Sequence, residues 1–301
     1  MLDEFYKELE EKYETGDSKV IEDFLLESTK KHYLCCGKTD DVQIAIFNEL
    51  GQFYLSSGRI KEAIDNFNQA KNFVATLCGG NSLEYANITN NLANAYRISG
   101  NADEALKEYK AALMIYKEVG STEGYFYSSA LNNIAIIYMQ KKMYTEAKDA
   151  LTSALEITEG KDELMQERAV ALTNMGSLFM FEGEDEKAMD YIKQSIALYD
   201  KLPDEKRVNL AAAYNTLGDL FFKQDEVEEA LSAYVVAKNL TLQFFGKNIE
   251  YIIACRKLAV VYEKQKKFDK RDDKIKEALA VMESLNLKNT KFYEDTKNMM
   301  K

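Results

Sequence analysis

The chain has 301 residues, of which 46% are hydrophobic and 30% charged, and it carries a formal net charge of −11 with a pI near 4.9. This acidic balance opposes nonspecific binding to nucleic acid and to anionic membrane surfaces. No apolar stretch approaches the roughly 18 residues that a membrane-spanning helix requires. We therefore predict a cytoplasmic protein without nucleic-acid or membrane partners.

The amino-terminal segment begins with MLDEFYKELEEKYE, an acidic and amphipathic stretch without the apolar core of a signal peptide. The single histidine, His32, lies near Cys35 and Cys36. Adjacent residues on a helix point about 100° apart, and no second Cys or His pair exists to complete four ligands. We predict no metal site and no cofactor. The four irregularly spaced cysteines are typical of a reduced intracellular protein, and Cys255 falls on a position expected to be buried.

From residue 40 onward a motif recurs every 41 or 42 residues, in which a small residue follows an apolar one. The small residues are Gly51, Ala93, Ala135, Gly176, Gly218 and Ala259. Three positions after them come Tyr54, Tyr96, Tyr138, Phe179, Phe221 and Tyr262. Residues four apart share one face of a helix, so the motif predicts one helix with a buried face in each unit.

A second periodic segment follows in each unit, after turn glycines such as Gly58, Gly100 and Gly183. It carries Ala63, Ala105, Ala147, Ala188 and Ala230, followed four residues later by Phe67, Tyr109, Leu151, Ile192 and Tyr234. Small side chains let two helices approach closely, and the larger ones fill the space beside them. Each unit is therefore predicted to be an antiparallel helical hairpin, and the whole chain an all-α solenoid.

These positions resemble the consensus of the tetratricopeptide repeat family over most of the chain. The usual period of that family is about 34 residues, and the present units are roughly eight longer, or about one extra turn on each helix. Strings such as NNLANAYRISGNADEALKEYKAAL resemble the long-repeat branch, which includes kinesin light chain, Pins-type adaptors and bacterial peptide-sensing regulators. The resemblance implies a right-handed α-solenoid of about seven hairpins, with the first helices lining a concave groove. The chain departs from the family pattern in its lack of tryptophan, in Lys142 at a turn-glycine position and in Arg271 at a buried alanine position.

The two ends of the chain are typical of a capped repeat array. Counting back 42 residues from Gly51 reaches Leu9, with Phe5, Gly16 and Ile21 in matching places. We expect one domain over residues 1–301, with a degenerate capping hairpin at 1–39, six full units over 40–285 and a capping helix at 286–301.

Residue types exclude several kinds of active site. One histidine allows no Ser/His/Asp or Cys/His triad in the body of the repeats and no two-histidine metal site. A GxxxxGK phosphate loop is absent, since the glycines mark hairpin turns. We predict that the chain is not an enzyme.

Polar residues recur on the helix face opposite the predicted core. Three positions before the small residue stand Asn48, Asn90, Asn132 and Asn215, with Thr173 and Arg256 in the same register. The other predicted groove residues are Gln52, Asn91, Asn94, Arg97, Asn133, Met139, Asn174, Met180, Asp219 and Phe222. The methionines and Phe222 suggest an apolar middle of the groove, whereas Phe181 is expected to pack under the neighbouring unit.

Asparagine is unfavourable inside a helix, so its recurrence at one repeat position needs a reason. The amides can bond between neighbouring first helices and set their spacing. They can also bond the backbone of an extended peptide, because a carboxamide offers both donors and an acceptor. The residues leave both readings open. Arg97 beside Asn94 offers part of a clamp for a terminal carboxylate, but matching lysines are missing from the adjoining unit.

The sequence predicts a monomeric interaction scaffold that binds a peptide or an extended partner segment in its groove. One alternative is a regulator whose superhelical pitch changes when a peptide binds. A third is an assembly unit that associates through its capping hairpins.

Overall fold

In the computed structural model, residues 1–36 and 41–300 are described, and these contain fifteen α-helices, two 3-10 turns and no strand. The side chains of His32, Cys35 and Cys36 lie outside the described part, and with them the sequence prediction about a metal at that place. The contacts divide the chain into two compact units, residues 1–143 and 144–301.

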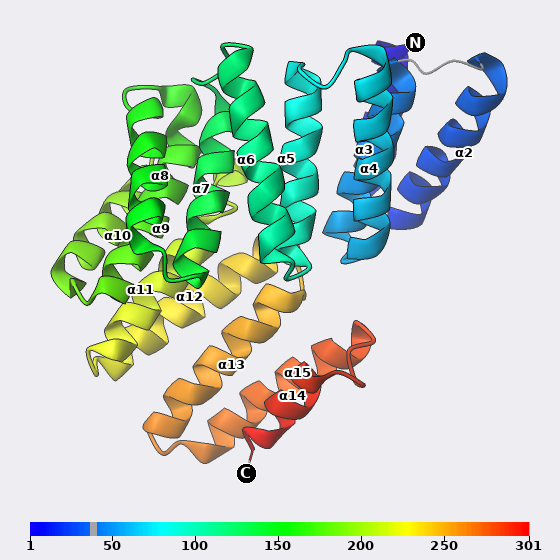
Figure 1. Cartoon of the computed structure of the whole chain (residues 1–301). Coiled ribbons are helices and arrows are strands. Elements are labelled where there is room, and N and C mark those ends of the chain that lie inside the picture. The colour runs from blue at the N-terminus through cyan, green and yellow to red at the C-terminus, as the bar shows by residue number, and fades with distance from the viewer. Residues whose placement is uncertain (37–40, 301) are drawn as a thin grey trace. The chain divides into compact units, whose positions relative to one another are not determined.

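Unit 1 contains α1 (Leu2–Glu14), α2 (Ser18–Cys36), α3 (Asp41–Ser56), α4 (Ile60–Leu77), α5 (Leu83–Ile98), α6 (Ala102–Glu118) and α7 (Tyr125–Gln140). Unit 2 contains α8 (Tyr144–Ile157), η1 (Asp162–Leu164), α9 (Met165–Glu182), α10 (Asp185–Tyr199), η2 (Asp204–Lys206), α11 (Leu210–Lys223), α12 (Val227–Phe245), α13 (Ile249–Lys264), α14 (Phe268–Ser284) and α15 (Lys291–Asn298). Within each unit consecutive helices pack against each other as antiparallel neighbours, as Figure 1 shows.

The core of each hairpin forms where the repeat positions predict it. The alanines of the second helices are fully buried, and so are Phe67, Tyr109, Leu151 and Ile192. The small residues of the first helices are buried at all six positions. Cys255 is also fully buried, as predicted, and burial raises the pKa of its thiol to about 11. The periodic pattern was therefore a correct guide to the core.

One turn geometry joins the two helices of every full repeat. The carbonyl of the repeat aromatic accepts the N–H group five residues later, as in Tyr54 O to Arg59 N at 2.8 Å and Tyr262 O to Lys267 N at 2.9 Å. The residue before that donor has a positive φ, which is typical of a Schellman helix end. The positive-φ residues of the six turns are Gly58, Gly100, Lys142, Gly183, Asp225 and Lys266. Three of the six therefore hold a side chain in a left-handed conformation that favours glycine.

Replacing Lys266 by glycine is expected to stabilise the protein by about 1 kcal/mol. The left-handed conformation, with φ 58° at Lys266, costs an L-residue roughly 1–2 kcal/mol, and the greater flexibility of unfolded glycine offsets only part of that gain. Urea unfolding of K266G measures the change. The matched control is Gly100→Ala, which is expected to destabilise the protein because φ there is +83°. The added methyl group meets open space, so the loss reports backbone strain and not a steric clash. A stabilised G100A variant would show that backbone strain does not decide these turns.

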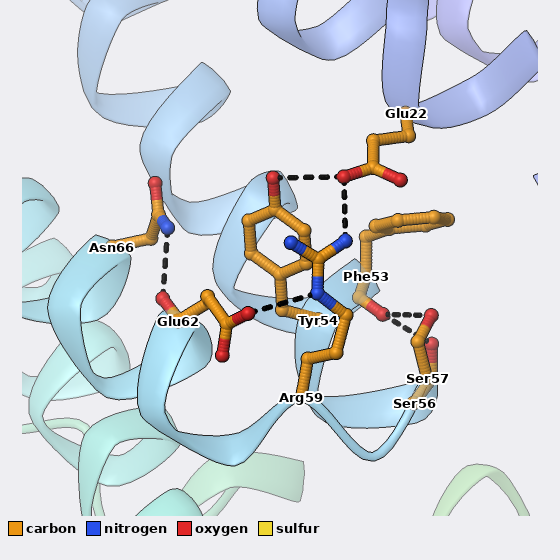
Figure 2. Close-up of polar contacts among 8 residues, drawn as sticks. All are labelled: Glu22, Phe53, Tyr54, Ser56, Ser57, Arg59, Glu62 and Asn66. Carbon is orange, nitrogen blue, oxygen red and sulfur yellow. Dashed lines mark hydrogen bonds and ion pairs between the residues drawn. The ribbon is translucent and has the colours of Figure 1, made fainter. Parts of the chain in front are cut away.

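The first hairpin is tied to the next repeat by a charged and aromatic contact (Figure 2). The Arg59 guanidinium lies over the Tyr54 ring at 4.2 Å and pairs with Glu22 of α2 at 2.6 Å and with Glu62 at 3.0 Å. The Tyr54 hydroxyl donates to the same Glu22 oxygen at 3.2 Å. Beneath this polar edge the rings and aliphatic groups of both hairpins share one apolar core. Residues 1–36 thus pack on the repeat array as an additional hairpin.

At the other end, Arg271 occupies the position where other repeats bury alanine. Its guanidinium pairs with Glu263 at 2.6 Å and with Asp272 at 2.8 Å, and it donates to the Met300 carbonyl at 3.2 Å. The final helix, α15, packs on α14 through Tyr293. Arg271 is accommodated at this position because its guanidinium forms ion pairs and donates a hydrogen bond to the carbonyl of Met300.

Candidate functional site

A hollow of about 380 Å³ opens on one face of unit 1. It is lined by the first helices α3, α5 and α7, with Tyr6 of α1 at its edge. Seven of its lining side chains are carboxamides: Asn48, Gln52, Asn87, Asn90, Asn91, Asn94 and Asn133. We call this hollow the amide groove. Six of its seven amides were predicted from the repeat register.

Register explains why these side chains meet. First helices of successive repeats lie side by side in unit 1, so equivalent positions form rows across them. Asn91 and Asn133 both stand two residues before the small residue of their repeats. The Asn91 amide donates to the Asn48 carboxamide oxygen at 3.0 Å and so joins α5 to α3. This contact supports the reading in which the amides set helix spacing.

Other amides of the groove are held by side chains behind them. The Arg97 guanidinium donates to Asn94 Oδ1 at 2.9 Å, and the Tyr116 hydroxyl donates to Asn87 Oδ1 at 2.8 Å. These bonds fix the oxygens and leave the NH₂ groups of both amides as possible donors to a ligand.

Asn90 differs from its neighbours. Its side chain is only 6% exposed, it lines the groove, and its Oδ1 has no hydrogen-bond partner. An unsatisfied buried acceptor costs about 1–3 kcal/mol. Among the described residues, no N–H or O–H group donates to this oxygen.

Two partly buried carboxylates belong to the helices that line the amide groove. Glu84, in the first turn of α5, lines it, and Glu49 follows Asn48 on α3. Burial raises the pKa of Glu84, and the nearby Asp41 carboxylate raises it further. Burial also raises the pKa of Glu49, although a hydrogen bond from Asn48 opposes that shift. Both groups are thus held in surroundings that disfavour their charged forms.

In unit 2 the corresponding face is occupied by contacts within the protein. Lys257 of α13 pairs with Asp219 of α11 at 2.7 Å, and Tyr234 donates its hydroxyl to the same carboxylate at 2.6 Å. Ser177 and Thr216 bond across α9 and α11 at 3.4 Å. These side chains satisfy each other, whereas Asn215, at the same repeat position as Asn90, also has an oxygen without a partner.

The remaining predicted residues lie outside the amide groove. Asn132 and Met139 of α7 are buried, with exposed fractions of 3% and 9%, and Arg97 is half-buried behind Asn94. In unit 2, half-buried side chains are found at Asn174, Met180, Asn215, Asp219 and Phe222. Phe222 packs on the core around Tyr234 and carries the Lys264 ammonium over its ring at 4.9 Å, and Asn215 Oδ1 has no partner.

Asn90 and Asn132 were predicted on the groove face, and their side chains are 6% and 3% exposed, with Asn90 among the lining residues. One expectation about side-chain exposure needs correction. Phe181 does not pack under a neighbouring unit: it is 58% exposed, and its ring stacks on Tyr144 with centroids 6.4 Å apart. It lies one residue before the end of α9.

Several lining residues were missed by the sequence analysis, among them Tyr6, Glu84, Asn87, Tyr125, Phe126 and Ser129. The predicted face began three residues before the small position, which is too late along the helix. Asn87 and Ser129 both stand six residues before it, one helical turn further toward the amino terminus. Extending the predicted face by one turn would have identified Asn87 and Ser129. Tyr6 belongs to another hairpin, and the repeat register gave no indication that it lines the groove.

Antiparallel helical hairpins in register, with small residues at the helix crossings, define a helical-repeat protein. A tetratricopeptide repeat profile matches residues 42–118, 84–160 and 167–243. The chain belongs to the tetratricopeptide repeat family.

Relatives and solved structures agree with this assignment. The chain is 31% identical over 91 residues to the photosystem I assembly protein Ycf3 of Rippkaea orientalis (strain PCC 8801 / RF-1), which is 30% of this chain and half the length of that relative. A Rap protein complexed with Competence and Sporulation Factor is 16% identical with a TM-score of 0.68, covering 99% of this chain and 82% of that one. A tetratricopeptide repeat protein from Parabacteroides merdae is also 16% identical with a TM-score of 0.64, covering 99% and 97%. At these identities the two structures establish the fold alone.

Among the described residues, no helix is long and apolar enough to cross a membrane. Over the same residues, no group of three or more His, Cys, Asp or Glu side chains is arranged to hold a metal ion.

Proposed function

We propose that this chain is a protein-interaction scaffold that binds an extended peptide segment in the amide groove of unit 1. The observation that carries the proposal is Asn90, a buried amide with an unpartnered oxygen in a hollow lined by six other carboxamides. A peptide backbone presents alternating N–H and C=O groups, which a row of carboxamides can bond whatever the peptide side chains are.

The groove has room for such a segment. A volume of about 380 Å³ falls within the usual range of ligand sites, about 300–1,000 Å³. The hydrogen bond from Asn91 to Asn48 joins two of the helices that line the groove, and a site held in shape before binding costs less free energy to order. The fold shared with a Rap protein complexed with Competence and Sporulation Factor is consistent with a peptide ligand. A ligand-driven change of pitch, a monomeric state and a cytoplasmic location stay predictions of the sequence.

The test compares two neighbouring asparagines. Random 12-residue peptides displayed on phage are selected against the full chain, and the binders are synthesised and titrated by fluorescence anisotropy. Asn90→Leu is expected to weaken binding at least about tenfold, the effect of losing roughly 1.4 kcal/mol of hydrogen bonding. It is also expected to stabilise the free protein by about 1 kcal/mol, since it removes an unsatisfied buried acceptor.

Asn91→Leu is the matched control. It removes the bond to Asn48 and is expected to destabilise the free protein by about 1 kcal/mol. If Asn90→Leu lowers stability and leaves peptide affinity unchanged, the amides are architectural and the proposed function is wrong.

A further inference from the structure

Glu84, which lines the amide groove, and Glu49, which follows Asn48 on α3, have no ion pair with a cation among the described residues. Among the described residues, the ion pairs of unit 1 join Arg59, Lys71 and Lys141 to acidic residues other than Glu49 and Glu84. Both carboxyl groups have a raised pKa because they are partly buried. Partial burial of these two carboxylates destabilises the folded protein when they are charged. No ion pair with a described cation of the chain offsets that loss.

Exposed aromatic rings line the same hollow. Tyr6 is 43% exposed and Phe126 is 40% exposed. Tyr6 lies close enough to Glu49 and Glu84 that their charges add to the effect of burial in raising the pKa of its phenol. Elsewhere in unit 1 aromatic faces already carry a cation of the chain, as Tyr54 carries Arg59 at 4.2 Å and Tyr138 carries Lys110 at 5.6 Å.

No described cation of the chain lies over the rings of Tyr6 or Phe126. Aromatic faces beside a carboxylate attract ammonium and guanidinium groups, since the ring quadrupole and the negative charge act in the same direction. The groove therefore lacks a cation at the place where its chemistry favours one.

The unpartnered Asn90 oxygen is an independent sign of a missing ligand in the same hollow. It needs an N–H donor, as the carboxylates need a positive charge. A metal ion would pair with the carboxylates but would make no contact with the aromatic rings. A basic peptide segment supplies both a cation for the carboxylates and rings and N–H donors for the amide oxygen. The net charge of −11 also favours encounter with a basic partner.

We propose that the partner segment carries a lysine or arginine whose cation binds beside Glu84 and the ring of Tyr6. The inference rests on the proposed function and adds to it the charge and position of one ligand side chain. Asn90 and the other amides hold the peptide backbone, and Glu84 sets the register of the segment in the groove.

The experiment uses the phage-selected 12-residue peptides and the full chain. Binders are expected to share one lysine or arginine at a fixed position, and its replacement by norleucine, which keeps the aliphatic chain without the charge, should weaken binding about tenfold or more. In the double variant Glu49→Gln with Glu84→Gln, the norleucine and lysine peptides should bind within about twofold of each other. Glu104→Gln is the matched control, since Glu104 is exposed in the first turn of α6, away from the groove, and should retain the full difference.

The outcomes separate the two proposals. Binders that depend on Asn90 but share no basic position, or that tolerate norleucine, would overturn the cation inference and leave a peptide-binding groove. Failure to select any peptide sensitive to Asn90 would overturn both.

Stability gives a second readout of the same carboxylates. Asp41 and Tyr6 face Glu84, and Tyr6, Tyr13 and Asn48 face Glu49. Because both folded-state carboxyl pKa values are raised, ionisation opposes folding as the pH rises past the unfolded pKa, and protonation removes that effect at low pH. The double glutamine variant should melt about 1–3 °C above wild type at pH 7 and show no such gain at pH 3.5. A variant that melts lower at pH 7 would mean that the two carboxylates stabilise the fold, against the inference.

Discussion

Replacing Phe67 by alanine is expected to cost about 3–5 kcal/mol of the free energy of unfolding of unit 1. The ring is fully buried on α4 and packs into a cluster with Leu50, Ala63 and Leu92. It fills the space that Gly51 leaves on α3, where an added methyl group would lie 2.5 Å from the ring. Removing the ring leaves a cavity that the facing glycine cannot fill.

Urea unfolding followed by circular dichroism measures this loss, since the chain has no tryptophan. The control is Gln69→Ala, an exposed position on the same helix, which should change stability by no more than about 0.5 kcal/mol. A Phe67→Ala loss below about 1.5 kcal/mol would show that the hairpin collapses around the missing ring, contrary to the packing described.

Replacing Gly218 by alanine is expected to cost about 1–3 kcal/mol, although the change adds only one methyl group. The new Cβ would lie 2.5 Å from Tyr234 Cε1 and 2.6 Å from Cδ1. Tyr234 has little freedom to move, because its hydroxyl donates to Asp219 at 2.6 Å and the Lys257 ammonium lies over its ring at 5.2 Å. The methyl group therefore forces apart α11 and α12 or breaks this contact.

A double-mutant cycle isolates the cause. Tyr234→Leu removes the ring edge that the methyl group meets, so Gly218→Ala with Tyr234→Leu should lose at least about 1 kcal/mol less than the sum of the two single changes. The last repeat already has this combination of sizes, since buried Ala259 is followed sixteen residues later by buried Ile275. Strictly additive losses would contradict a steric conflict at this pair.

These two predictions show how far the repeat pattern reaches. It placed Gly218 and Tyr234 on facing helices, and it predicted that a small residue is needed opposite a large one. It did not distinguish glycine from alanine at that position. That choice depends on the distance between two helices and on the direction of one ring, which neighbouring contacts such as Tyr234 to Asp219 decide.

The turns show a similar division. Gly58, Gly100 and Gly183 marked the helix ends, and Lys142 was recognised as standing at a glycine position. Asp225 and Lys266 adopt the same left-handed conformation without any local sequence signal. Packing of the two helices imposes the turn on them, because a tight hairpin permits only that backbone geometry.

The sequence by itself determined the repeat length, the helical hairpins, the buried faces and the row of asparagines, because these follow from periodicity along a single helix. Only the tertiary structure decided which amides form a groove. Asn91 donates a hydrogen bond from α5 to Asn48 of α3, and the Asn90 side chain is buried with an unpartnered oxygen. Tyr6, which belongs to another hairpin, lines the same hollow as Glu84. Such relations depend on how neighbouring helices are spaced and rotated, and a pattern read along one helix contains no information about the distance to the next.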